Sequence, residues 1–70
     1  MDERQMSVDI LIYECNDCRG KWAACMYEAR DMDQADEYIL SKLTGHGDTP
    51  LEAAANLLAY AESERKRLAP

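Results

Sequence analysis

The sequence predicts an α+β fold, because two runs with strand character are followed by one long helical pattern. β-Branched residues recur at every second position over residues 7–15, and apolar residues alternate in the same way over 21–29. The helical pattern begins at Thr49 with a capping signal and continues with alanines and leucines. A chain of 70 residues has room for one small core. We expect a polar, flexible arm over residues 1–6 and a single domain over 7–68.

The two strand-like runs predict a β-hairpin. Turn chemistry between them comes from Asn16, Asp17 and Gly20. With a period of two, one face of the hairpin carries Val8, Ile10, Ile12, Trp22, Ala24 and Met26. The opposite face carries Leu11, Tyr13, Ala23, Cys25 and Tyr27. Both faces are therefore apolar, whereas an antiparallel sheet covered on one side usually has a polar outer face.

The segment that follows the hairpin begins with an acidic connector and continues with a pattern that fits two structures. The connector carries Asp31, Asp33 and Asp36. Residues 37–44 fit a third strand, or two helical turns capped by Asp33, and helix propensity favours the second. The alternatives stay open at this point.

The clearest local signal is the start of the C-terminal helix, after an expected flexible loop over 45–48. Thr49 is the predicted N-cap, Pro50 occupies the first helical position, and Glu52 completes a capping box. An arc of apolar residues should face the sheet, namely Leu51, Ala54, Ala55, Leu57, Leu58 and Ala61. The basic residues 65–67 should interact favourably with the negative, C-terminal end of the helix dipole.

The cysteines raise the question of a zinc site. Cys15 and Cys18 have the spacing of a zinc knuckle, and Cys25 and His46 could complete a tetrahedral set. A strong zinc signature has a second close pair, which this sequence lacks. We therefore expect no metal and no cofactor, and keep the set Cys15, Cys18, Cys25 and His46 as an alternative hypothesis.

Composition excludes several classes of protein. A net charge of −6 argues against a basic surface that binds nucleic acid, and 47% hydrophobic residues argue against a disordered chain. There is no apolar run of membrane-spanning length and no signal-peptide pattern, so we expect a cytoplasmic protein without membrane contact. His46 has no identifiable nucleophile beside it in the sequence, which favours a non-enzymatic role.

The residues around the helix start resemble the HicB-like antitoxin domain and small phage or prophage proteins with the same core. The matching positions are Gly47, Asp48, Thr49, Glu52, Ala53 and the run 56–58. The resemblance implies a three-stranded antiparallel sheet with one C-terminal amphipathic helix packed on one face (β-β-β-α), and a third strand over 37–44. The turn that usually precedes the glycine loop in that family is replaced here by residues 31–36.

These observations predict a protein-binding module of antitoxin or inhibitor type that occludes a basic partner protein and forms a homodimer. The expected partner-binding residues are Leu11, Tyr13, Tyr27, Asp31, Asp33, Asp36 and Glu37. Between residues 28 and 48, acidic side chains outnumber basic ones six to two, which would steer a basic partner. The alternative is a phage-encoded inhibitor of bacterial immunity, similar to anti-CRISPR proteins, whose carboxylates imitate nucleic acid.

Overall fold

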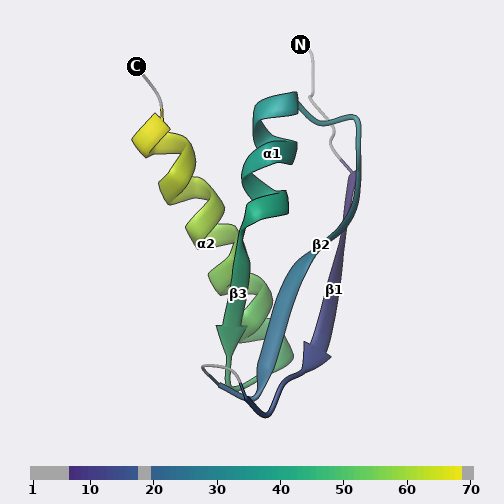
Figure 1. The fold of residues 1–70 in the computed structure, drawn as a ribbon, viewed down its shortest axis with the longest axis vertical. Helices are drawn as coiled ribbons and strands as arrows, with labels where there is room; N and C mark the ends of the chain where they lie inside the picture. The colour runs from purple at the N-terminus through teal and green to yellow at the C-terminus, as the bar shows by residue number, and fades with distance from the viewer. Residues whose placement is uncertain (1–6, 18–19, 69–70) are drawn as a thin grey trace.

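The computed structural model describes residues 7–17 and 20–68, and contains a three-stranded sheet and two helices. The elements follow the order β1 (Ser7–Glu14), β2 (Trp22–Arg30), α1 (Gln34–Lys42), β3 (Thr44–Gly47) and α2 (Pro50–Leu68). The sheet is antiparallel with strand order β1-β2-β3, and α2 crosses it behind β3 in Figure 1. The predicted α+β class, with a three-stranded sheet and a C-terminal helix, is confirmed. The expected arm over 1–6 lies outside the described residues.

The β1–β2 hairpin forms where the alternating pattern predicts it. The Cys15 amide donates a 2.8 Å hydrogen bond to the Lys21 carbonyl at the end of the hairpin. Gly20 has a φ of 109°, a conformation that side chains with a Cβ rarely adopt. The register shifts once, because Asp9 pairs with Glu28 whereas the next residue, Ile10, pairs with Met26. Tyr27 is thus the extra residue of a β-bulge in β2.

Residues 31–47 settle the alternative that the sequence left open. Most of the ambiguous segment is helical, and α1 buries Ile39 and Leu40. The third strand lies at Thr44–Gly47 instead of 37–44, so the position implied by the resemblance is wrong. The expected loop over 45–48 is wrong for the same reason, since most of it is β3. Asp33 precedes α1 at the N-cap position, but its side chain makes no capping hydrogen bond.

Helix α2 begins as predicted and lies directly against β3. The Glu52 amide donates a 3.1 Å hydrogen bond to the Thr49 hydroxyl, which is the expected N-cap contact. A Cβ added at Gly45 would lie 2.7 Å from the Leu57 Cα, and one added at Gly47 would lie 2.7 Å from the Ala53 amide nitrogen. Glycine is therefore required at both positions, because the helix backbone occupies the space of a side chain.

This close approach corrects the predicted buried face of α2. Ala53 and Leu57 are fully buried, whereas Leu51 is 83% exposed, Ala55 is exposed and Leu58 is about half exposed. The predicted arc is confirmed at Leu57 but missed Ala53, because a strand with glycines at its contact points lets the helix backbone approach most closely at a small residue.

The core lies between the sheet and the two helices. Its buried centre consists of Ala24, Leu40, Ala53 and Leu57. Around it pack the partly buried residues Val8, Ile10, Trp22, Met26, Met32, Leu43 and Ala61. The predicted inner face of the hairpin is thus confirmed except at Ile12, which is 37% exposed. Among the described residues, no helix is long and apolar enough to cross a membrane.

Candidate protein-binding surface

The sheet face turned away from α2, here called the outer face, exposes apolar and aromatic side chains. Leu11 pairs with Cys25, and Tyr13 pairs with Ala23, so these predicted residues share one face of the hairpin. Leu11 is 48% exposed and Tyr13 is 40% exposed. Ala23 is fully buried although it belongs to this face, because Tyr13 and His46 are its neighbours on the two flanking strands. The outer face is therefore a largely apolar surface on which Leu11 and Tyr13 are the exposed large side chains of β1.

The bulge in β2 brings a further aromatic side chain to the surface. Tyr27 is 73% exposed, the highest value among the four tyrosines. A bulge bends its strand and redirects the side chain of the extra residue. The alternating sequence pattern predicted that Tyr27 is exposed. It did not predict the bulge, because a bulge depends on how two strands pair.

Two carboxylates lie opposite each other at the same end of the hairpin. Asp9 pairs with Glu28 across the strands, and the Arg30 side chain lies 3.5 Å from the Asp9 carboxylate. Like charges directly opposite on a sheet repel each other. A single exposed arginine compensates for only part of that repulsion. Sequence reasoning missed this pair, because opposition of two residues 19 positions apart depends on the shifted register.

The acidic residues of the connector fall into two groups. Asp33 and Asp36 both approach Arg65 of α2, and the Arg65 guanidinium donates a hydrogen bond to the Asp36 carboxylate. Asp31 and Glu37 are exposed, and no ion pair of the described residues includes them. The sequence predicted that Arg65 would interact with the helix dipole. Its ion pairs with Asp33 and Asp36 join distant parts of the chain, so local sequence could not predict them. The structure thus brings Leu11 and Tyr13 together on the sheet but places Asp36 and Glu37 in the first turn of α1 and Asp33 at its N-cap position.

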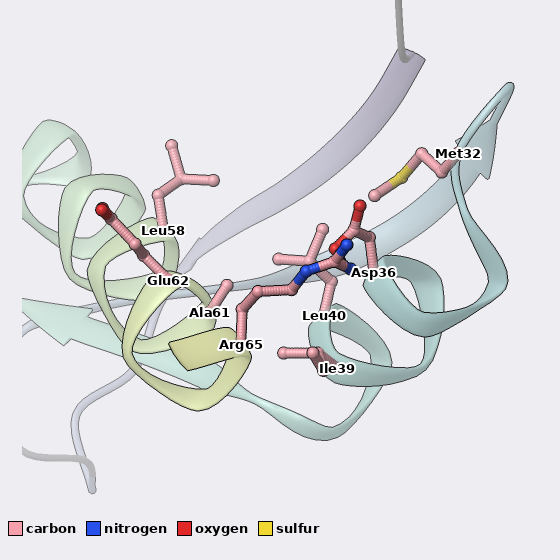
Figure 2. A pocket seen from close by; sticks show the side chains of 8 residues that line it. All are labelled: Met32, Asp36, Ile39, Leu40, Leu58, Ala61, Glu62 and Arg65. Atoms are coloured by element: carbon pink, nitrogen blue, oxygen red, sulfur yellow. The ribbon is translucent and has the colours of Figure 1, made fainter. Parts of the chain in front are cut away.

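A groove of about 200 Å³ lies between α1 and α2 (Figure 2). Its lining is mainly apolar and includes Met32, Asp36, Ile39, Leu40, Leu58, Ala61, Glu62 and Arg65. Figure 2 shows the Arg65 side chain extending from α2 towards Asp36 on α1, across the groove. The ion pair therefore joins the two helices where their apolar contact ends.

The C-terminal turns of α2 carry an ion pair of their own. Arg67 donates two hydrogen bonds to the Glu64 carboxylate, at 3.2 and 2.6 Å. These hydrogen bonds hold the pKa of Glu64 below its ordinary value and raise the pKa of Arg67. The contact is local to the helix and lies away from the outer face.

The described residues of the alternative zinc set do not form one metal site. Cys15 is disulfide-bonded and Cys25 is a free thiol, while Cys18 lies outside the described residues. His46 belongs to β3, where its carbonyl accepts a hydrogen bond from the Asn56 side chain. Within residues 7–17 and 20–68, no three His, Cys, Asp or Glu side chains are grouped as metal ligands would be. A disulfide sulfur cannot act as the thiolate ligand that zinc requires.

Comparison with known proteins finds no matching family model, no similar curated protein and no similar solved structure. The outer face and its charges are therefore the basis for the functional proposal.

Proposed function

We propose that this protein is a non-enzymatic binding module of the antitoxin or inhibitor type, which covers a basic surface of a partner protein with its outer face. The observation that carries the proposal is the exposure of Leu11, Tyr13 and Tyr27 beside the opposed carboxylates of Asp9 and Glu28. The resemblance to HicB-like antitoxin domains supports the same class of function.

The apolar part of the outer face supplies a driving force for binding. Tyrosine buries a large area at a low entropy cost and keeps a polar tip, which explains its enrichment at interface centres. Leu11 and Tyr13 lie on neighbouring outer-face positions of β1, and Tyr27 projects from β2. A partner that covers these side chains removes them from water without any change in the fold.

The acidic part supplies the preference for a basic partner. A lysine or arginine placed between Asp9 and Glu28 would replace their repulsion by two attractive contacts. Charges at the edge of an interface also increase the rate of association. The expected partner therefore presents an apolar patch with basic residues at one side of it.

The alternative, an acidic inhibitor that imitates nucleic acid, assigns binding to the connector instead. Asp31 and Glu37 have exposed carboxylates that suit this role. Arg65 already compensates part of the negative charge of Asp33 and Asp36, which makes the connector a weaker imitation of a row of phosphates. For this reason the outer face is the favoured surface.

The test is a pair of matched double variants used as immobilised bait in bacterial lysate, with captured proteins identified by mass spectrometry. Tyr13→Ser with Tyr27→Ser should lose the specific partner, because it removes the two exposed tyrosine rings of the β1–β2 hairpin. The control, Tyr38→Ser with Tyr60→Ser, removes two exposed tyrosines from the helices and should retain it. Circular dichroism checks that both variants keep their helical content.

A third variant separates the two hypotheses. Asp31→Asn with Glu37→Gln should slow association and reduce its salt dependence while a stable complex still forms. If this variant loses the partner and the Tyr13/Tyr27 variant retains it, the connector is the binding surface and the outer-face proposal is wrong.

A further inference from the structure

The two edges of the sheet differ in how well their backbone is protected. At β3, the Asn56 side chain donates a hydrogen bond to the His46 carbonyl, and α2 packs closely against a strand of four residues. At the other edge, β1 has eight residues and, among residues 7–17 and 20–68, pairs on one side only, with β2. Figure 1 shows no described helix or strand beyond β1. An unprotected edge offers a row of amide and carbonyl groups to another strand.

β1 has few of the usual features that prevent such pairing. Proteins commonly place proline, lysine or a bulge on an exposed edge strand, or keep that strand short. The sequence of β1 is SVDILIYE, which has two acidic residues, Asp9 and Glu14, but neither proline nor lysine, and the extra residue of the bulge lies in β2. Apolar side chains remain partly exposed on both of its faces, with Leu11 on the outer face and Ile12 on the inner face.

We propose that β1 pairs antiparallel with β1 of a second copy, about a two-fold axis at Leu11, so that the two sheets become one of six strands. A two-fold axis perpendicular to the sheet is required for antiparallel pairing of identical edges, and it opposes side chains of the same face. It also places α2 of both copies on the same side of the joined sheet.

The axis at Leu11 is favoured because it sets apolar side chains opposite apolar ones at the centre of the interface and gives Asp9 a polar partner. Leu11 then lies opposite the partner's Leu11, and Ile10 lies opposite the partner's Ile12. Asp9 lies opposite the partner's Tyr13, whose hydroxyl can donate a hydrogen bond to the carboxylate.

Shifted registers lose this match. An axis at Ile10 sets Asp9 against the partner's Leu11, and an axis at Asp9 opposes two carboxylates. An axis at Ile12 leaves Asp9 opposite no residue of the partner's β1. Of these four registers, only the axis at Leu11 gives the Asp9 carboxylate a hydrogen-bond donor on the partner's β1, and it does so while setting Val8 opposite the partner's Glu14.

Such a dimer deepens the proposed function. Only its use as a larger binding surface rests on that function, and the pairing of the two β1 strands does not. The outer faces of both copies would join into a continuous binding surface with two sets of Tyr13, Tyr27, Asp9 and Glu28. The evidence for pairing, however, comes from the edge of β1 and not from the exposure of the outer face.

The register can be tested by cross-linking in the full chain with Cys25→Ser as the background, using a short bis-maleimide reagent without added reductant so that the Cys15 disulfide stays closed. Leu11→Cys should give a covalent dimer, because the two introduced thiols face each other at the axis. Tyr13→Cys should not cross-link to itself, but mixing it with Asp9→Cys chains should give a mixed dimer. The background protein alone should remain uncross-linked.

Sedimentation measurements over a range of concentrations test the dimer itself. The unmodified protein should dimerise, and Leu11→Lys should weaken dimerisation at least about tenfold, because two lysines would oppose each other at the axis. Tyr27→Ser should dimerise normally. Circular dichroism of Leu11→Lys shows whether the monomer is folded, and the cross-linking result does not depend on that variant.

A monomer at all concentrations, or self-cross-linking at position 13 but not at 11, would overturn the inference. An unmodified chain that stays monomeric but still captures its partner would reject the β1 pairing and leave the proposed function standing. A cross-linked dimer whose Tyr13/Tyr27 variant captures the partner as well as the unmodified protein would reject the proposed function alone.

Discussion

Gly45→Ala tests the packing on which the position of α2 depends. The added methyl group would meet the Ala53 carbonyl oxygen, the Leu57 amide nitrogen and the Leu57 Cα, all of which are backbone atoms of α2. No rotation of a side chain can relieve these contacts. Either α2 moves away from β3, or the strand moves away from the helix.

The magnitude follows from the geometry. The new Cβ would lie 2.7 Å from the Leu57 Cα, which is about 0.7 Å inside the 3.4 Å at which ordinary contact begins. Overfilling of a packed core costs about 1–3 kcal/mol, and the clash with three backbone atoms places this case at the upper end. Alanine regains about 0.4–1 kcal/mol by restricting the unfolded chain. We expect a net loss of about 2–3 kcal/mol, which corresponds to a fall in Tm of about 10–20 °C.

Thermal and urea unfolding, followed by circular dichroism at 222 nm, measure this loss. His46→Ala is the matched control, because it alters the next residue of β3 on the outer face and leaves the carbonyl that Asn56 binds. It should change stability by less than about 1 kcal/mol. Ala53→Gly should fail to rescue Gly45→Ala, because the obstructing atoms belong to the backbone.

Two results would refute the reasoning. A Gly45→Ala variant that unfolds within a few degrees of the unmodified protein would show that α2 does not lie against β3. Rescue by Ala53→Gly would show that the contact is made by the Ala53 side chain and that the two backbones are further apart.

Three further predictions concern the remainder of α2. Thr49→Ala should cost about 1 kcal/mol in thermal unfolding, because the Glu52 amide loses its capping acceptor, and an unchanged Tm would contradict that contact. Asn56→Ala should cost about 1–3 kcal/mol in urea unfolding, since a partly buried carbonyl of β3 loses its donor; a loss below 0.5 kcal/mol would mean that water replaces the amide. In an NMR titration the pKa of Glu64 should lie below its ordinary value and return to it in Arg67→Gln, so the contribution of this pair to stability is present at neutral pH and is lost as the pH falls through that pKa. Identical titration curves for the two proteins would reject the hydrogen bonds.

Local patterns were sufficient for the features that depend on near neighbours. Alternation predicted the hairpin and most of its inner face, and the signal at Thr49 and Pro50 predicted the first turn of α2. These features depend on turn chemistry, backbone capping and side-chain period, all of which act within a few residues.

Features that depend on distant contacts were missed or misplaced. The apolar arc correctly included Leu57 but also favoured the exposed Leu51 and Leu58, and it missed Ala53, which the two glycines of β3 bring into the buried face. A run of Gly-His-Gly has low strand propensity, so β3 is identified by its pairing with β2 and not by its composition.

The candidate site shows the same division. Leu11 and Tyr13 were placed on one face by their spacing, and the register confirms that placement. The opposition of Asp9 and Glu28 depends on a bulge in β2, and the contact between Arg65 and Asp36 joins residues 29 positions apart. Neither contact has a counterpart in local sequence.

The short length of β3 divides β2 into two halves. Trp22–Cys25 lie between β1 and β3, whereas the remaining residues of β2, up to Arg30, pair with β1 alone. Each amide in the Trp22–Cys25 half is directed at either β1 or β3, so this half can exchange all of its amides with solvent deuterium only when both neighbouring strands separate, which should require nearly complete unfolding. The half of β2 that follows Cys25 can open beside Tyr27 while Trp22–Cys25 stay paired, so its amides should exchange before those of Trp22–Cys25.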